Sequence, residues 1–480
     1  MSIRVYDTLS RSVKPLGAHD PNRPFGMYCC GPTVYGPAHI GNFRTFINQD
    51  ILRRVLQLDG ISVHHVRNIT DVDDKTIQRS QAEGLPLQEF TSKWTRLFHE
   101  DCAALNLLPP HVEPSAIAHI PLQVGMIQKL LASGHAYTAT DGSVYFKVSS
   151  FHDYGKLSHL NLGELRTQST NSAGSPNDAD EYEREHASDF ALWKTRKPED
   201  GPNHWPSPWG EGRPGWHIEC SAMSTHYLGD TFDLHGGGED LCFPHHENEI
   251  AQAECATGHS GFARHWFHGR HLMVDNKKMS KKLGNLYTLA DLRARGATPM
   301  AVRYALLSGH YRSQLNFTLE GLAGAASALA KLEKAAGKLL ARCGLSKSDF
   351  ASISTPEPTT TWGSFAGAWN ELREDLNVPA ALGKVFAAFP ETSADGRALD
   401  QARADLSGLG NVLYALGLVL FTDAPQEPAQ APAIVEELAR QRWKAKQARD
   451  FAQADAFRYK LEQLGWKALD RKDGYSLEKV

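Results

Sequence analysis

The chain has 480 residues, enough for two to four domains, and its 51 basic and 55 acidic residues nearly cancel. This balance neither indicates nor excludes a nucleic-acid partner, and it means that any basic surface is local. The sequence starts without an apolar signal core and has no run of about 18 apolar residues, which predicts a cytoplasmic protein that does not span a membrane. Its seven cysteines, an odd number, favour free thiols or metal ligands over a disulfide framework.

The first predicted unit begins at residue 26. Residues 26–30 are expected to form a short buried strand, 45–58 an amphipathic helix and 61–66 the next strand. Strand, helix and strand in this order make a βαβ unit with parallel strands. The loop before the helix contains His39-Ile40-Gly41-Asn42, which we expect at a helix N-terminus, where N–H groups and the helix dipole attract phosphate. Taken alone, so short a motif also fits an ordinary helix start.

A second unit follows much later in the chain. Its strand is predicted at 231–234, its helix at about 245–256 and its next strand at about 266–274, with three glycines between the first strand and the helix. The two units predict an α/β fold: a doubly wound parallel (Rossmann-like) sheet, split by an α+β insertion. Ligands bind such sheets at the carboxyl ends of the strands.

The remainder of the chain is expected to be mostly helical. Helices are predicted at 321–343, 364–388, 399–420 and 433–449, and Asp450 is the predicted N-cap of a last helix, followed by a small hairpin around Asp473-Gly474. Residues 431–480 carry 11 Lys and Arg against 8 Asp and Glu, a net charge of +3. The resulting domain plan is 1–115 (first half of the sheet), 116–225 (insertion), 226–300 (second half of the sheet), 301–325 (junction), 326–421 (helical domain), 422–432 (linker) and 433–480 (basic C-terminal end).

A cationic loop and a possible metal site belong to the second unit. Residues 277–282 contain four lysines, which could neutralise a triphosphate as charge builds up in a transition state, although a solvated charge run is the simpler interpretation. His245 and Glu249 lie four residues apart on one helix face, which fits either half a metal site or two polar residues on a wet face.

Taken together, the motifs resemble a known family. The HIGN motif in the first unit and KMSKK in the second resemble the HIGH and KMSKS signatures of class I aminoacyl-tRNA synthetases, with Asn42 and Lys282 as departures. The segments GMYCCGPTVY, NITDVDDK, GWHIECSAM and HGGGEDLCFPHHENE resemble the cysteinyl-tRNA synthetases over the whole chain. The resemblance implies ATP-dependent activation of L-cysteine and its transfer to tRNA(Cys), with Mg²⁺ accompanying ATP. Residues 1–115 and 226–300 would then form the catalytic domain, 326–421 a tRNA-binding domain and 433–480 the anticodon-binding end. A monomer is expected.

The resemblance also implies the site residues. One Zn²⁺ would be held by Cys30, Cys220, His245 and Glu249. The catalytic residues would be His39, Asn42, Lys278 and Lys281. Cysteine would contact Gly31, Thr33, Thr70 and Trp216. The adenylate would contact His39, His235, Gly236, Gly237, Gly238, Asp240 and Lys281. Unpaired tRNA bases could stack on Trp443 and Trp466, with a core position the equal alternative for Trp443.

Several neighbouring side chains have donor atoms and could be mistaken for metal ligands. Cys29 and Cys242 are expected in the core, and His246 and Glu247 are expected to point away from the metal. Because Cys and Ser are nearly isosteric, shape alone discriminates poorly between them, whereas zinc prefers thiolate, so no editing domain is expected. Since four protein ligands close a zinc site, Glu249 is expected to loosen when the substrate thiol binds.

Three alternatives remain open at this stage. A zinc-dependent ligase that joins cysteine to an amino sugar, as in mycothiol synthesis, would share both sites. A zinc hydrolase would use His245 and Glu249 as ligands and His246 or Glu247 as base, and would give the lysine loop no role. A tRNA-binding module without catalysis would not need two intact phosphate-binding loops.

Overall fold

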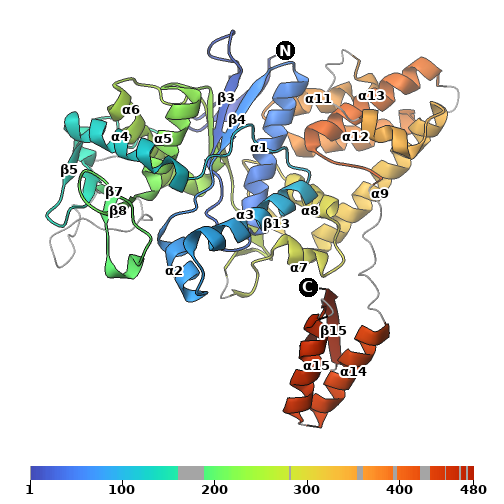
Figure 1. Ribbon diagram of the computed structural model, residues 1–480. Helices are drawn as coiled ribbons and strands as arrows, with labels where there is room; N and C mark the ends of the chain where they lie inside the picture. Colours follow the sequence, from blue (N-terminus) through green and yellow to red (C-terminus); the bar gives the residue numbers. More distant parts are fainter. Residues whose placement is uncertain are drawn as a thin grey trace. The chain divides into compact units, whose positions relative to one another are not determined.

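A computed structural model describes residues 2–159, 189–280, 283–353, 361–392, 397–421, 433–448, 450–463, 466–471 and 474–479. The chain divides into two compact units, residues 1–421 and 422–480, which are described separately (Figure 1). The predicted linker 422–432 lies outside the described residues. The finer domain boundaries stay predictions.

A parallel four-stranded sheet lies at the centre of the first unit. Its strands run in the order β10 (Trp266–Gly269), β9 (Leu234–Gly238), β3 (Phe25–Cys29) and β4 (Val63–Arg67). The two predicted βαβ units therefore meet in one sheet, with β3 paired to β9. The second strand was predicted too early, because β9 runs through all three glycines and pairs there with β10.

Helices cover both faces of this sheet (Figure 1). One face packs on α1 (Ile40–Leu58), and the other on α5 (Trp216–Leu228) and α6 (Glu247–Thr257). Because successive strand side chains point to opposite faces, Cys29 belongs to the core with α1, as predicted, whereas Cys30 belongs to the core with α5 and α6. Adjacent thiols thus lie in different layers.

The insertion forms a separate antiparallel sheet, β5 (Ala136–Thr138), β6 (Val144–Phe146), β7 (Phe190–Thr195) and β8 (Gly212–Pro214), beside α4 (Ile120–Ala132). Its apolar core, which includes Phe146, Phe190 and Trp193, also takes in Ile218 from α5 and Ala251 from α6. The insertion is therefore packed directly on two helices that carry predicted site residues. The polar segment 169–181, predicted as a loop, lies outside the described residues.

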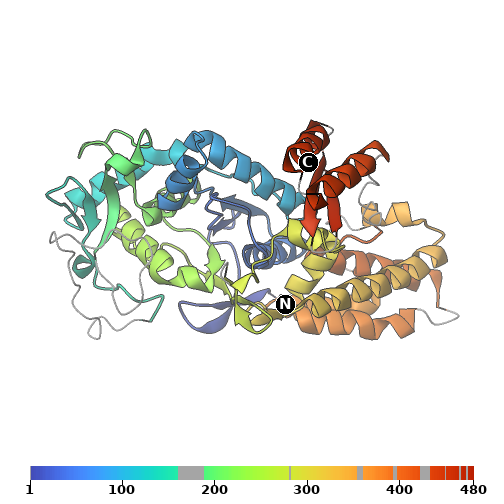
Figure 2. The same ribbon diagram turned by 90° about the horizontal axis from the view of Figure 1, so that it is seen from below.

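Further helices and small sheets complete the first unit. They are the hairpin β1 (Arg4–Asp7) and β2 (Ser12–Pro15), the helices α2 (Asp74–Ala82) and α3 (Leu87–Ala104), the sheet β12 (Lys277–Lys278), β11 (Leu272–Val274) and β13 (Leu315–Phe317), and the helices α7 (Leu289–Arg293), α8 (Pro299–Leu307), α9 (Leu319–Arg342), α10 (Phe350–Ile353), α11 (Ala366–Arg373), α12 (Val378–Thr392) and α13 (Leu399–Leu416). Figure 2 shows α9 alongside α13.

Two predicted elements are each broken in two. The strand expected over 266–274 is divided between β10 and β11, which belong to different sheets. The helix expected over 364–388 is interrupted between α11 and α12, where Asp375 adopts a φ of 57°. The Asp375 carboxylate accepts hydrogen bonds from the Tyr311 hydroxyl at 2.5 Å and the Arg312 Nε at 2.7 Å. Periodicity could not reveal this break, because the partners that stabilise it are 63 and 64 residues away.

A buried ion pair joins α1, α8 and the end of α13. The Arg303 side chain is completely buried, and its Nη2 lies 2.5 Å from Asp50 Oδ2. Arg303 also donates to the backbone carbonyls of Leu416 and Leu105, each at 2.8 Å. The guanidinium thus caps the carboxyl end of α13.

The second unit contains two helices and a hairpin: α14 (Ala433–Gln447), α15 (Phe451–Gln463), and β14 (Trp466–Arg471) with β15 (Gly474–Lys479). Asp450 caps α15, as predicted, because its Oδ1 accepts from the Gln453 N–H at 3.1 Å. Trp466 is only 6% exposed and belongs to the small core, so it is unsuitable for stacking on a base, contrary to the prediction.

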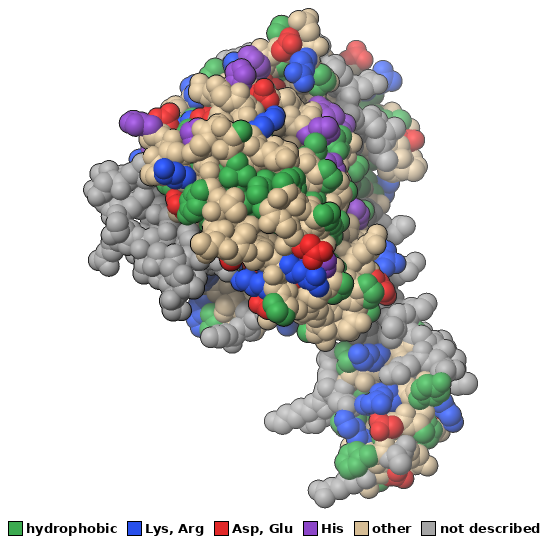
Figure 3. Space-filling view, turned by 60° about the vertical axis from the view of Figure 1, so that its left-hand side comes forward, with side chains coloured by type: hydrophobic (Ala, Val, Ile, Leu, Met, Phe, Trp, Pro, Cys, Tyr) green, Lys and Arg blue, Asp and Glu red, His purple; other side chains and the backbone are tan. Residues whose placement is uncertain are grey.

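Across the described residues, no helix combines the length and apolar character needed to cross a membrane. On the face drawn in Figure 3, the described Lys and Arg side chains are interspersed with Asp and Glu side chains, in keeping with the near-neutral total charge.

Candidate active site and metal centre

Four predicted metal ligands meet at the carboxyl edge of the central sheet. Cys30 follows β3, Cys220 lies on α5, Glu249 lies on α6, and His245 lies in the distorted turn just before α6. Their donor atoms all lie within 4.8 Å of one another, and all four residues are buried. The helix predicted over 245–256 is regular only from Glu247, because His245 and His246 belong to the distorted turn, but the spacing of four residues still brings His245 Nε2 to 3.0 Å from Glu249 Oε1.

The donor separations fit a tetrahedral metal centre. With metal–sulfur bonds near ~2.3 Å and metal–nitrogen bonds near ~2.0 Å, such a centre needs donors roughly 3.3–3.8 Å apart. The two sulfurs of Cys30 and Cys220 are 3.8 Å apart, and Cys30 Sγ lies 3.6 Å from Glu249 Oε1. Two sulfurs, an imidazole and a carboxylate are a donor set that suits zinc.

The metal-free electrostatics show what these groups do without an ion. Burial alone would raise the pKa of Cys220, but hydrogen bonds from Cys30 and His245 lower it to about 6. Burial would raise the pKa of Glu249, but His235 and His245 lower it to about 2. Burial would lower the pKa of His245, but Glu249 raises it to about 10. Burial raises the pKa of Cys30 well above its usual value. The cluster therefore holds Cys220 and Glu249 ionised, and it holds protons on Cys30 and His245 that a bound metal would displace.

A layer of histidines lies around the metal candidates. The prediction that His246 points away is wrong, because His246 Nε2 lies 3.4 Å from Cys30 Sγ. Glu247 does point away, and its carboxylate accepts from the Ser158 N–H at 2.7 Å. His235 is completely buried and its Nε2 lies 2.8 Å from Glu249 Oε2, so it faces the metal candidates rather than an open adenylate surface. Cys242 lies in the core, as predicted.

The residues predicted to bind cysteine are grouped beside this cluster. The Trp216 ring lies 4.2 Å, centroid to centroid, from the His245 ring. Thr33 and Thr70 form a parallel bridge at the ends of adjacent strands. Gly31 is required there, since a Cβ at this position would lie 1.6 Å from the backbone oxygen of Asn68.

One residue of this pocket was not singled out from the sequence. Glu219 is completely buried, and its Oε2 accepts from the Thr70 hydroxyl at 2.9 Å. Burial raises its pKa well above the ordinary value. Only its place beside Cys220 in the GWHIECSAM segment pointed to it, and a glutamate next to a ligand is by itself weak evidence for a role.

The HIGN motif caps α1. The Asn42 N–H donates to His39 Nδ1 at 3.3 Å, and the His39 N–H donates to Asn42 Oδ1 at 3.1 Å. The side-chain oxygen of Asn42 therefore already accepts a backbone hydrogen bond. Its side-chain NH₂ is the group that can donate to a phosphate. Burial lowers the pKa of His39, with opposition from Asp240.

The lysine loop lies against this motif. Met279 covers Gly41, because a Cβ on Gly41 would lie 2.3 Å from Met279 Cε. Lys278 is exposed at the end of β12. Asn285 holds the base of the loop, since its Oδ1 accepts from the Ser280 N–H at 2.9 Å and its Nδ2 donates to the Lys278 carbonyl at 3.3 Å. Lys281 lies outside the described residues.

Comparison with known proteins gives the family. A family model described as the class I (C) tRNA synthetase catalytic domain matches residues 19–327. A protein named cysteine–tRNA ligase from Opitutus terrae is 55% identical, covering 100% of this chain and 99% of the relative. The chain belongs to the class I cysteinyl-tRNA synthetase family. A relative of the same name from Chlamydia felis is 41% identical, covering 100% of this chain and 98% of that protein.

Solved structures of other class I synthetases share the fold. A methionyl-tRNA synthetase from Mycobacterium tuberculosis, in complex with methionyl-adenylate, aligns with a TM-score of 0.55 at 12% identity, over 82% of this chain and 89% of that one. A putative arginyl-tRNA synthetase from Campylobacter jejuni aligns with a TM-score of 0.53 at 13% identity, over 84% and 94%. At this identity the likeness supports the fold alone, and it confirms the predicted α/β class.

The three glycines of β9 have different surroundings in this synthetase fold. Gly237 makes room for a histidine, since a Cβ there would lie 2.7 Å from the His246 ring. Gly236 borders Cys29, and Gly238 lies against the side chain of Asp240 at the strand end. Close approach to adenine is therefore not the reason for Gly237, although Gly238 and the exposed Asp240 lie at the ligand-binding edge.

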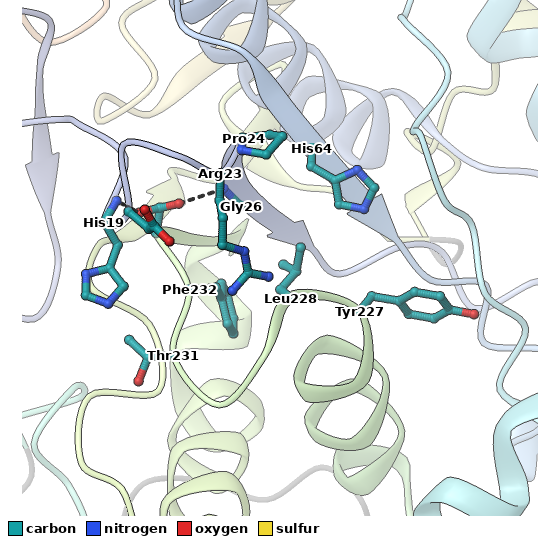
Figure 4. Close-up of a pocket in the computed structure, with 11 residues that line it drawn as sticks. His19, Arg23, Pro24, Gly26, His64, Tyr227, Leu228, Thr231 and Phe232 are labelled. Carbon is teal, nitrogen blue, oxygen red and sulfur yellow. Dashed lines mark hydrogen bonds between the residues drawn. The ribbon is translucent and has the colours of Figure 1, made fainter.

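A separate cavity of about 280 Å³ lies at the opposite edge of the sheet (Figure 4). It is bordered by Gly26 at the start of β3 and by Asp233 just before β9, with His19, Arg23 and His64 around it. The Asp233 carboxylate has a structural role, because its Oδ2 accepts a hydrogen bond from the Gly26 N–H at 2.6 Å. The cavity is remote from the carboxyl strand ends, so it has no part in the candidate active site.

Proposed function

We propose that this chain activates L-cysteine with Mg-ATP to give cysteinyl-adenylate and pyrophosphate, and then transfers the cysteinyl group to the 3′ end of tRNA(Cys). One observation carries this proposal: four candidate metal ligands, two of them thiols, and two motifs suited to phosphate lie at the same sheet edge, in a chain 55% identical to a cysteine–tRNA ligase over its full length. Neither a hydrolase nor a binding module needs both.

Cys30, Cys220, His245 and Glu249 would hold one Zn²⁺. Bound there, zinc supplies a Lewis acid that prefers thiolate to hydroxyl, which gives the selection of cysteine over serine that shape cannot. Trp216 would form the floor of the amino-acid pocket. Gly31, Thr33 and Thr70 would orient the amino and carboxyl groups, which fixes the carboxylate for attack on the α-phosphate.

The phosphate groups would be held by the two motifs. His39, Asn42, Lys278 and Lys281 would stabilise the charge that develops on the phosphates, and Mg²⁺ would accompany ATP. Gly236, Gly238 and Asp240 are proposed for the adenylate, whereas His235 is better suited, from its hydrogen bond to Glu249, to orienting that carboxylate.

The second unit is proposed to contact the tRNA. Basic side chains along α14, including Lys444 and Lys446, suit salt-dependent phosphate contacts. Phe451 and Tyr459 on α15 are 61% and 63% exposed, which makes them better candidates for base stacking than the buried Trp466. A monomeric state and a cytoplasmic location stay predictions from the sequence.

Cysteine-dependent exchange of labelled pyrophosphate into ATP tests the proposal. Exchange with cysteine, and little with serine, is the expected result, and aminoacylation of tRNA(Cys) should follow. A zinc hydrolase would give no exchange with intact metal. The amino-sugar ligase would also give exchange, but it would transfer cysteine to an amino sugar instead of tRNA. Aminoacylation of tRNA(Cys) therefore separates the two ligases. Absence of exchange in zinc-replete protein would overturn the proposal.

The behaviour of Glu249 is a further part of the proposed mechanism. Because four protein ligands close the site, we propose that Glu249, the hard oxygen ligand, loosens when the substrate thiol binds. X-ray absorption with and without cysteine measures this directly. The expected change is one added sulfur and a weaker oxygen shell; an unaltered spectrum would argue against it.

A further inference from the structure

Cys30 and Glu249 face a second pair of metal-binding side chains. His246 Nε2 lies 3.4 Å from Cys30 Sγ, and His235 Nε2 lies 2.8 Å from Glu249 Oε2. The donor atoms of these four residues also lie within 4.8 Å of one another, and all four residues are buried. The separations resemble those of the first set, so the same geometric argument applies to both.

The Glu249 carboxylate lies between the two sets. Its Oε1 is 3.0 Å from His245 Nε2, on the side of the first set. Its Oε2 is 2.8 Å from His235 Nε2, on the side of the second. A carboxylate that presents one oxygen to each side can bind an ion at either position without changing its rotamer. The Cys30 sulfur can also bind at either position, because it lies 3.8 Å from Cys220 Sγ and 3.4 Å from His246 Nε2.

The ring of His246 is oriented as metal-binding imidazoles are. Its Nδ1 forms a 2.8 Å hydrogen bond with His268 Nε2, and His268 Nδ1 lies 2.7 Å from the Thr8 hydroxyl. A ligating histidine almost always bonds through its second ring nitrogen in this way, which fixes the ring and directs the other nitrogen to the metal. His245 has the corresponding support, since its Nδ1 lies 2.9 Å from His217 Nδ1.

We propose that the chain contains a second zinc position, formed by Cys30, His235, His246 and Glu249, which the ion takes when Cys220 and His245 are not available as ligands. The inference rests on the proposed zinc centre and extends it. The two positions share Cys30 and Glu249, so they are alternatives. The first offers two sulfurs and one imidazole, and the second offers one sulfur and two imidazoles, which makes them spectroscopically distinct.

The test removes the two ligands that belong only to the first position and measures how much zinc the chain still binds. The full-length double variant Cys220→Ser with His245→Gln keeps only Cys30 and Glu249 of the first position. After incubation with zinc and dialysis, we expect close to one zinc per chain, with an X-ray absorption shell of one sulfur and two imidazoles. Adding His246→Gln should lower zinc affinity at least about tenfold, the scale of losing support around a ligand. Adding Cys242→Ala instead is the matched control, because this buried thiol is not a donor in either set.

Three outcomes are informative. If the double variant binds zinc no better than the triple variant, the second position does not exist. If circular dichroism shows that the double variant is unfolded, the alternative double variant Cys220→Ala with His245→Asn replaces it, and equal zinc affinity with and without His246→Gln overturns the inference. The wild-type chain reports separately on the proposed function, because a shell with two sulfurs is expected there whatever the variants do.

Discussion

Replacing Arg303 with methionine should strongly destabilise the first unit. The guanidinium is completely buried, it pairs with Asp50 at 2.5 Å, and it donates to the carbonyls of Leu416 and Leu105. Methionine fills much of the same volume but donates nothing. Asp50 would keep only its bond from Arg54 Nε at 2.8 Å and that from the Leu108 N–H at 2.9 Å.

The size of the effect follows from these contacts. Removing one partner of a buried ion pair costs about 3–5 kcal/mol. Because Asp50 retains Arg54, the low end of that range applies to the pair. The two carbonyls that lose their donor add about 1 kcal/mol or more each. We therefore expect the free energy of unfolding to fall by roughly 5 kcal/mol or more. This is a large part of the typical total of about 5–15 kcal/mol.

Urea unfolding followed by far-ultraviolet circular dichroism measures this loss as a shift in the midpoint of the first unit. The control is Arg403→Met, whose partner Asp400 lies 3.9 Å away and whose side chain is 63% exposed. This exposed pair should contribute about 0.2–1 kcal/mol at most. If Arg303→Met costs no more than Arg403→Met, the argument from burial is refuted.

Other changes probe the loop, the tRNA surface and pH. Asn285→Ala removes both hydrogen bonds at the base of the lysine loop, so kcat for pyrophosphate exchange should fall about tenfold, with an unchanged cysteine KM and zinc content. Asn285→Asp keeps the acceptor but cannot donate to the Lys278 carbonyl, so its kcat should lie between those of the wild type and Asn285→Ala. A change in KM alone would contradict this role. Replacing Phe451 and Tyr459 with alanine should raise KM for tRNA and leave pyrophosphate exchange intact, and loss of exchange would argue against stacking. Burial raises the pKa of Asp101 to about 6, so the folded chain binds this proton more tightly than the unfolded chain and gains stability as pH falls from about 6 towards 4. Asp101→Asn should accordingly be more stable than the wild type near pH ~8, with the difference gone near pH ~4 in matched urea titrations.

Part of the candidate metal site could be predicted from local sequence patterns. The His245 and Glu249 pair follows from helical spacing, and the opposite orientations of Cys29 and Cys30 follow from strand alternation. The combination of Cys30 and Cys220, 190 residues apart, came from resemblance and not from local pattern.

Other features depend on contacts that local patterns do not contain. His246 was expected to point away because it lies on a different helix face from His245 and Glu249. Cys30 approaches that face as well, so His246 Nε2 lies 3.4 Å from Cys30 Sγ, and no local pattern shows where Cys30 will lie. The three glycines looked like a loop, since glycine is poor in strands. They form a strand because all three pair with β10, and Gly236 also pairs with β3. The His246 ring leaves no room for a Cβ at Gly237, and the Asp240 side chain leaves none at Gly238.

The adjacent thiols of Cys29 and Cys30 illustrate how the sheet controls chemistry. Two neighbouring cysteines in a flexible peptide are exposed to the same reagents and the same ions. Here the backbone of β3 places one sulfur in each apolar layer, so the two are physically separated although they are consecutive in sequence. The same residue type thereby gives a packing group at Cys29, the last residue of β3, and a candidate metal ligand at Cys30, directly after it. The direction of each side chain decides which role is open to it.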